Sequence, residues 1–302
     1  MNLFKYLLVA GIICFTVSCS KSTSDSDDDN TPQAVDKSAN LLATGDSAND
    51  ILSNDNFDKI VVEIAYVTGF RPTESAMAQF TDYLKEHTFK QNIELIYTEL
   101  SSPVEDELTL QEIADLETKN RTVFNTGSAL GIYIYFSDAP AEGDEPEDGL
   151  VTLGAVYRNT SMIIHEVTVR DLASRSITIS DSDVETTTLN HEFGHLFGLV
   201  DLGTDMVNDH QSQSENSEGQ LVGDNHCNQN GCLMRAELQF GGATGKTNLA
   251  NNKAAYEVGL KAGCVFSGTS ALRLLQSNSA KGSAAVGLDP ECILDIRANG
   301  GR

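Results

Sequence analysis

Apolar and polar positions follow two alternating periods in the first part of the folded chain. The run KIVVEIAYVTGF (residues 59–70) is rich in β-branched and apolar side chains, which is typical of a buried strand, and NIELIYTEL (92–100) and GIYIYFS (131–137) share this pattern. Between these runs, residues 71–87 and 109–124 have apolar positions at helical spacing. Alternating strands and helices predict an α/β fold built on one sheet.

Two more strands and a long helix are predicted in the part that follows. The runs LVTLGAVY (150–157) and TSMIIHEVTV (160–169) are apolar and β-branched. The run VETTTLNHEFGHLFGL (184–199) has the length of a helix, and Ser182 or Asp183 can cap its start. The expected architecture is a twisted mixed sheet that carries this helix.

The long helix contains the pattern H-E-x-x-H-x-x-G in residues 191–198. His191 and His195 are four residues apart, so both imidazoles project from one helical face and can bind a single metal ion. Glu192 then points to the space beside that ion, where its carboxylate can take a proton from water. Gly198 is suited to end the helix, because glycine adopts the left-handed conformation without strain. This set predicts one catalytic Zn²⁺ ion and peptide hydrolysis.

Residues further along the chain extend this pattern into a resemblance. H-E-x-x-H-x-x-G followed by a methionine turn resembles the metzincin metalloproteases, and Met234 would be the methionine beneath the metal. The segment HCNQNGCLM (226–234) is similar to the H-C-x-x-x-x-C-x-M segment of archaemetzincins, in which that histidine is the third zinc ligand. Archaemetzincins place it directly after the glycine, whereas residues 199–225 intervene here. The resemblance covers residues 190–234 and implies a metzincin-like α+β fold with an active-site helix.

Three residues compete as the third metal ligand. His226 has the archaemetzincin-like context, in which a local disulfide would hold it against the methionine turn. Asp201 has the spacing of the third ligand in snapalysin-like metzincins, H-E-x-x-H-x-x-G-x-x-D, and a carboxylate is an acceptable zinc ligand. His210 lies in the inserted loop 202–225, which could fold over the cleft and either block or shape it. Imidazole suits zinc better than a single carboxylate, which favours His226.

The amino-terminal residues indicate export. A lysine followed by LLVAGIICFTVSC is typical of a lipoprotein signal peptide over residues 1–18, with Cys19 as the lipid-bearing first residue of the mature chain. An ordinary cleaved signal peptide is the alternative, because Thr16 fits the lipoprotein cleavage motif poorly. Residues 19–50 are rich in Ser and Asp and predict a flexible tether. We therefore expect an exported protein, lipid-anchored at a bacterial outer membrane or cell surface.

The rest of the chain divides into a predicted catalytic domain, residues 51–240, and a smaller C-terminal subdomain, residues 241–302. The whole chain has 44 acidic and 20 basic residues and a net charge of −24, which argues against nucleic acid and anionic membrane surfaces as partners. Lipid would then be the only membrane contact, and the partner would be a protein or peptide substrate. We expect a monomer.

Four cysteines remain when the signal segment and the lipidation site are set aside. An even number in an exported chain predicts two disulfides, and we expect the pairs Cys227–Cys232 and Cys264–Cys292 among the three possible connectivities. A zinc site built from the four thiols is the alternative, although they lack paired C-x-x-C spacing.

The sequence thus predicts a zinc-dependent endopeptidase in which His191, His195 and one further residue bind the ion, and Glu192 is the general base. A surface lipoprotein binding module is the alternative, with a structural zinc on an inactive protease scaffold. The long polar loop 202–225 motivates this alternative, because such a segment can cover a cleft as well as shape it.

Overall fold

The structure is a computed structural model, and it describes residues 36–146, 151–175, 177, 179–215, 218–235, 266–267 and 286–302. The predicted signal peptide, Cys19 and Cys264 lie outside these residues. Within the described residues, no helix is both long enough and apolar enough to cross a membrane.

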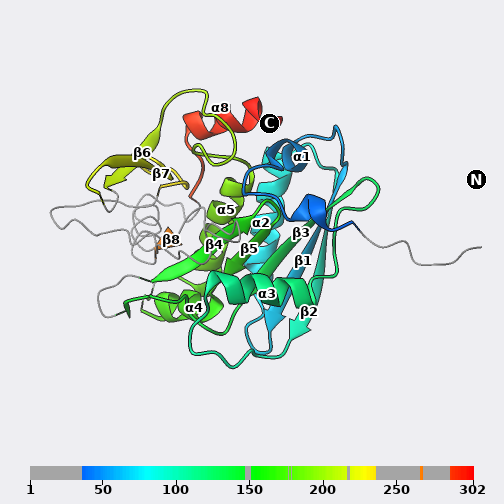
Figure 1. Cartoon of the computed structure of the whole chain (residues 1–302), viewed down its shortest axis with the longest axis vertical. Coiled ribbons are helices and arrows are strands. Elements are labelled where there is room, and N and C mark those ends of the chain that lie inside the picture. Colours follow the sequence, from blue (N-terminus) through cyan, green and yellow to red (C-terminus); the bar gives the residue numbers. More distant parts are fainter. Residues whose placement is uncertain are drawn as a thin grey trace, which may run out of the picture. The chain divides into compact units, whose positions relative to one another are not determined.

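A six-stranded sheet forms the centre of the fold (Figure 1). In spatial order its strands are β2 (Asn92–Leu100), β1 (Lys59–Val67), β3 (Ala129–Phe136), β5 (Ser161–Ile164), β4 (Thr152–Arg158) and β8 (Phe266–Ser267). The first four are parallel, whereas β4 runs antiparallel to β5 and β8 runs antiparallel to β4. The predicted mixed α/β sheet is therefore confirmed, and β4 is its antiparallel member.

Helices cover the two faces of this sheet. The helices α2 (Glu74–His87) and α5 (Asp181–Leu196) pack on one face, and α3 (Leu110–Asn120) packs on the other. Successive side chains of a strand point to opposite faces, so neighbouring residues of β3 join different cores. Ile132 belongs to the core on the α2 and α5 side, while Tyr133 belongs to the core on the α3 side. The helix with the histidine pattern thus lies directly against the sheet.

The start and the end of α5 are both fixed by local chemistry. Ser180, rather than the predicted Ser182 or Asp183, is the N-cap. The Asp183 amide donates to the Ser180 hydroxyl, and the Ser180 amide donates to the Asp183 carboxylate at 2.8 Å. This capping box pairs two backbone donors at the helix start, which explains the earlier start. At the other end Gly198 has a φ of +77°, as predicted for the residue that turns the chain.

Residues 160–169, predicted as one strand, divide between two elements. The strand β5 ends at Ile164, and the helix α4 (Glu166–Ser174) follows at once. Val169, Leu172 and Ala173 are buried at helical spacing. The apolar pattern that continues beyond residue 169 therefore favours a helix over a longer strand.

The end of the predicted tether is folded as well. The short helices η1 (Ser38–Asn40) and α1 (Ala48–Leu52) begin within residues 19–50. The buried Asn40 side-chain amide donates to the Gly131 carbonyl and to the Thr160 hydroxyl, both at 3.1 Å. The tether predicted from polar composition was wrong for these last residues. The buried Asn40 side chain is stabilised by hydrogen bonds to residues that are distant in the sequence.

Candidate metal centres

The helix α5 carries two of the predicted metal ligands. His191 and His195 are both fully buried, and their ring centroids are 5.1 Å apart. They lie on one face because four residues make about one helical turn. The pair is therefore placed as the sequence predicts.

A hairpin brings the third histidine to this pair. The strands β6 (Gln211–Glu215) and β7 (Leu221–Cys227) pair antiparallel within the inserted segment. His226, near the end of β7, has its ring centroid 5.5 Å from that of His191 and 5.8 Å from that of His195. One ring nitrogen of each histidine lies within 4.8 Å of one nitrogen of each other. We call these three residues the histidine site.

The two other candidates for the third ligand lie elsewhere. Asp201 is exposed, has a φ of +60°, and does not belong to the histidine site. His210 is buried, but its Nδ1 lies 2.8 Å from the Asn208 carbonyl oxygen and its Nε2 lies 3.5 Å from Cys292 Sγ. The inserted segment forms a paired hairpin that leads the chain back to α5. His226 therefore lies beside the helix histidines, although Asp201 and His210 are closer to them in sequence.

The two helix histidines are held in the neutral form that metal binding requires. Burial, reinforced by the neighbouring His226, lowers the pKa of His191 to about 3, and burial lowers the pKa of His195 well below its usual value. His191 Nδ1 lies 2.7 Å from the Leu233 carbonyl oxygen, so a proton on Nδ1 would make Nε2 the nitrogen that donates its lone pair to a metal ion. Within the described residues, neither His195 ring nitrogen makes a well-formed hydrogen bond. These donors fit a zinc ion.

Glu192 lies beside the histidine site against the strand β4. Its side chain is fully buried, and burial raises the pKa of its carboxyl group well above the usual value. A Cβ atom on Gly154 of β4 would lie 2.9 Å from Glu192 Cγ and 2.9 Å from Thr188 Cγ2. Gly154 is therefore needed for this close approach of strand and helix, a role that no motif in the sequence signals.

Met234 packs against α5 at Gly194, which precedes His195 in the helix. A Cβ atom on Gly194 would lie 2.3 Å from Met234 Sδ, so the glycine provides the space for the thioether. The Met234 carbonyl oxygen accepts a hydrogen bond from the Cys227 amide at 2.8 Å. The methionine thus closes a loop that starts next to His226.

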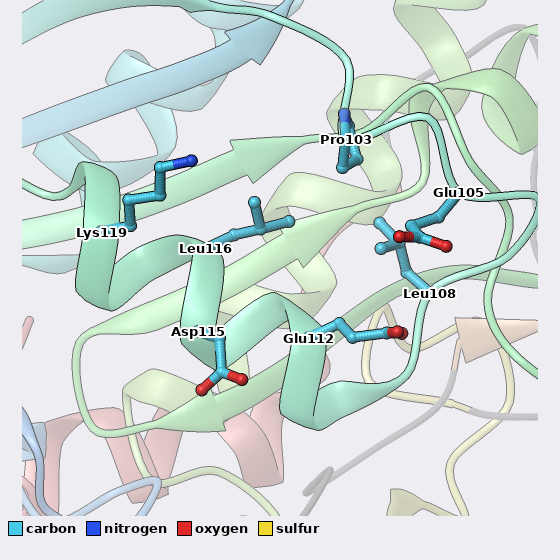
Figure 2. A pocket seen from close by; sticks show the side chains of 7 residues that line it. All are labelled: Pro103, Glu105, Leu108, Glu112, Asp115, Leu116 and Lys119. Atoms are coloured by element: carbon cyan, nitrogen blue, oxygen red, sulfur yellow. The ribbon is translucent and has the colours of Figure 1, made fainter.

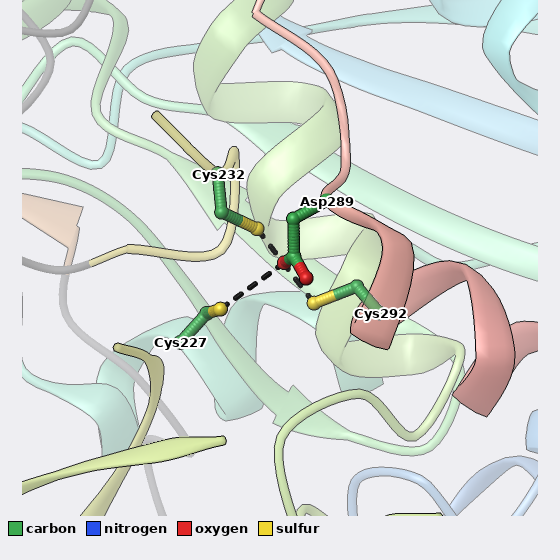
Figure 3. Close-up of side chains that lie close together, drawn as sticks. All are labelled: Cys227, Cys232, Asp289 and Cys292. Atoms are coloured by element: carbon green, nitrogen blue, oxygen red, sulfur yellow. Dashed lines mark hydrogen bonds between the residues drawn. The ribbon is translucent and has the colours of Figure 1, made fainter. Parts of the chain in front are cut away.

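Three thiols and a carboxylate form a second cluster (Figure 3). Cys227, Cys232, Cys292 and Asp289 each offer one donor atom within 4.8 Å of the others. Cys227 Sγ lies 3.1 Å from Asp289 Oδ2, and Cys232 Sγ lies 3.7 Å from Cys292 Sγ. Asp289 caps the helix α8 (Pro290–Ala298), which carries Cys292. We call these four residues the thiolate site.

The thiolate site corrects the predicted disulfides. Cys227, Cys232 and Cys292 are all free cysteines, so the local Cys227–Cys232 bridge does not form. The thiols instead converge on Asp289, a residue that the cysteine spacing could not reveal. The predicted partner of Cys292, Cys264, lies outside the described residues. This set of donors matches the alternative of a metal site, with a carboxylate in place of the fourth thiol.

Hydrogen bonds within the thiolate site favour an ionised sulfur. They lower the pKa of Cys227 to about 5, because its sulfur accepts from Cys232 and Cys292. The pKa values of Cys232 and Cys292 are raised, chiefly because these two thiols donate to Cys227. Thiolates are the form in which cysteine binds metals, so this cluster has the chemistry of a metal site.

A surface pocket beside α3 shares no residue with either site (Figure 2). Its lining side chains are Pro103, Glu105, Leu108, Glu112, Asp115, Leu116 and Lys119. The pocket lies at the helix that covers one face of the sheet, whereas α5 and its histidines cover the other. We assign it no function.

Comparison with known proteins gives a likeness to solved structures and none to known sequences. No protein-family model matches the chain, and no curated protein sequence matches it. Among solved structures the chain is similar to archaemetzincin from Methanopyrus kandleri, with a TM-score of 0.40 and 13% sequence identity over 81% of this chain and 96% of that one. The chemistry of the two sites therefore rests on the residues described above.

Proposed function

We propose that the chain is a zinc-dependent endopeptidase whose catalytic ion is held by His191, His195 and His226. The observation that carries this proposal is the convergence of a hairpin histidine on the two helix histidines, next to a buried glutamate. Three protein ligands leave one position of a tetrahedral zinc ion open for water or substrate. Zinc bound there would polarise the peptide carbonyl and make water more acidic.

Glu192 is the proton carrier in this proposal. A zinc ion held by the three histidines would favour the ionised carboxylate and so offset the effect of burial on the pKa of Glu192. The carboxylate takes a proton from water as the water oxygen attacks the peptide carbonyl carbon. It then gives that proton to the amide nitrogen as the carbon–nitrogen bond breaks. The lack of a side chain at Gly154 leaves the room in which the Glu192 side chain lies beside the strand β4.

The thiolate site would hold a second ion with a structural role. Three sulfurs and one carboxylate form a complete tetrahedral set, which leaves no position for substrate. Soft sulfur ligands favour zinc over magnesium or calcium. The ion would tie the start of α8 to the segment that follows the hairpin.

The experiment is metal analysis together with peptide cleavage by the purified full chain and its Glu192→Gln variant. We expect both proteins to contain zinc, and the variant to lose about 10²- to 10⁴-fold in kcat/KM on casein-derived peptides. Asp201→Ala is the matched control and should retain both zinc and activity, because Asp201 is exposed outside the site. Undiminished cleavage by the Glu192 variant would contradict the mechanism.

The complete burial of His195 and Glu192 favours one alternative function. A site closed to peptides would hold zinc for structure alone, and the chain would be a surface binding module. Zinc bound to the histidine site without cleavage of any peptide in a random library would support this alternative.

We also propose that the protein is exported and carries lipid on Cys19. The signal-like residues 1–18 and the cysteine that follows them support this. Radiolabelled palmitate should appear in the wild-type chain and not in the Cys19→Ala variant. Label in both proteins, or in neither, would contradict the lipid anchor.

A further inference from the structure

One short segment serves both candidate metal sites. Residues 226–234, which we call the shared segment, supply His226 to the histidine site and both Cys227 and Cys232 to the thiolate site. The carbonyl group of Leu233 in the same segment contacts His191 Nδ1 at 2.7 Å. The position of this segment therefore sets ligand geometry at both sites.

The residues just before α8 hold the shared segment from the other side. The Leu233 amide donates to the Gly287 carbonyl oxygen at 2.8 Å, and the Leu233 carbonyl oxygen contacts His191. Leu233 therefore connects the residues before α8 to the histidine site. Asp289 Oδ2 faces Cys227, while Asp289 Oδ1 accepts a hydrogen bond from the Glu291 amide at 2.8 Å. One carboxylate thus joins the thiolate site to the first turn of α8.

The base of the hairpin completes this support. The Asn228 amide donates to the His210 carbonyl oxygen at 2.8 Å, and the His210 ring lies 3.5 Å from Cys292 Sγ. His210 Nε2 also lies 3.6 Å from a carboxylate oxygen of the buried Asp295. His210, a candidate catalytic ligand by sequence, is placed as an outer support of the thiolate site.

We propose that the two sites bind their ions cooperatively, because filling the thiolate site orders the shared segment and so positions His226 and the Leu233 carbonyl group for the histidine site. This inference rests on the proposed function. A chain segment loses conformational freedom when an ion fixes its donors, and that loss accompanies whichever ion binds first. The second ion then meets ligands already in place and binds more tightly. Asp289 and Cys292 are accordingly positioning residues for the catalytic site.

Cobalt titration of the metal-free full chain tests this coupling. Thiolate-bound Co²⁺ absorbs strongly in the near ultraviolet through sulfur-to-metal charge transfer, whereas histidine-bound Co²⁺ gives weaker visible bands, so each site has its own signal. The variants are Asp289→Asn and Cys292→Ser, and the exposed Arg297→Ala on the same helix is the control. Asparagine can still cap α8, so Asp289→Asn separates the loss of a ligand from the loss of the helix.

We expect the histidine site of Asp289→Asn and Cys292→Ser to bind Co²⁺ about 5- to 150-fold more weakly, the usual range of coupling between sites, and Arg297→Ala to match wild type. Circular dichroism identifies variants that do not fold. His195→Ala, which keeps α8 intact, supplies the reverse test, because coupling is reciprocal: its thiolate site should weaken by a comparable factor.

The outcomes separate the two proposals. Equal histidine-site affinity in wild type and in a folded Asp289→Asn variant, or an unchanged thiolate site in His195→Ala, would overturn the coupling and leave the proposed peptidase untouched. Failure of the wild-type histidine site to bind any Co²⁺ would overturn the proposed function itself.

Discussion

The histidine site and the thiolate site both take residues from the shared segment, yet they differ in the charge of their donors. The histidine site offers three imidazole nitrogens and no carboxylate or thiolate, so an ion there would keep its positive charge for a substrate carbonyl. The thiolate site offers sulfurs and a carboxylate, which would neutralise the same ion and complete its coordination. In the proposed function, donor charge and donor number therefore distinguish the catalytic site from the structural one.

The largest expected effect comes from removing a histidine-site ligand. His195→Ala should lose one zinc per chain and all measurable peptide cleavage, because two remaining histidines are too few for tight zinc binding. The near-ultraviolet cobalt band of the thiolate site should remain present. Peptide cleavage assays with metal analysis make the measurement. If the variant loses the thiolate signal and keeps cleavage, the roles of the two sites are reversed.

Removal of the structural ion should have the largest effect on stability. A ligand present at 100 to 1,000 times its dissociation constant stabilises a folded protein by about 3–4 kcal/mol. Stepwise chelation should therefore abolish cleavage first, when the open histidine site empties, and lower the melting temperature chiefly when the thiolate site empties. Differential scanning calorimetry at each stage of zinc loss checks this order. A single melting shift that coincides with the loss of activity would contradict the assigned division.

A smaller effect is expected from the outer support of the thiolate site. His210→Ala should weaken metal binding at the thiolate site by about 10- to 100-fold, as outer-shell substitutions do. The reason is the loss of the ring between Cys292 and Asp295. Competition with a coloured zinc chelator measures the affinity, and Asp201→Ala serves as the control. An affinity equal to that of wild type would make His210 a packing residue only.

The smallest effect is a pH dependence of the free energy of unfolding, which comes from Glu166 and not from either metal site. Burial and the nearby Glu185 carboxylate of α5 raise the pKa of Glu166 to about 9, although Arg170 Nε donates to it at 2.6 Å. Its folded-state pKa is above the unfolded value of 4.5, so its stabilising contribution is complete below about pH 4.5 and is lost as the pH rises towards 9.

Urea unfolding between pH 5 and 9 measures this contribution. The free energy of unfolding should fall as the pH rises over this range. Glu166→Gln should flatten the slope, since its side chain stays neutral at every pH. An equal slope in the variant would show that other groups control the pH dependence.

The histidine site was largely predictable, because its information is local or concentrated in short motifs. The spacing of His191 and His195 gives a shared helix face, and Gly198 gives the turn that ends the helix. The choice of His226 over Asp201 depended on how residues 199–225 fold, and the sequence left that choice open. Pairing of the two hairpin strands brings His226, and not Asp201, to the two helix histidines.

The thiolate site could not be predicted in the same way. Asp289 precedes Pro290 at the start of a helix, so by sequence it is an ordinary N-cap, and only the fold brings it to Cys227. The cysteine count favoured disulfides, because an exported chain usually oxidises its thiols. The burial of Asn40 was hidden for a related reason, since its partners come from distant parts of the sequence.

The contact between Gly194 and Met234 means that these two positions cannot change independently. A methyl group on residue 194 would meet the Met234 sulfur at 2.3 Å, in a part of the core where Met234 is fully buried. Gly194→Ala alone should therefore destabilise the fold, and the same change made together with Met234→Ala should cost less than the sum of the two single changes. In the history of such a chain, the order of substitutions would decide which variants survive: a smaller residue at 234 must come first.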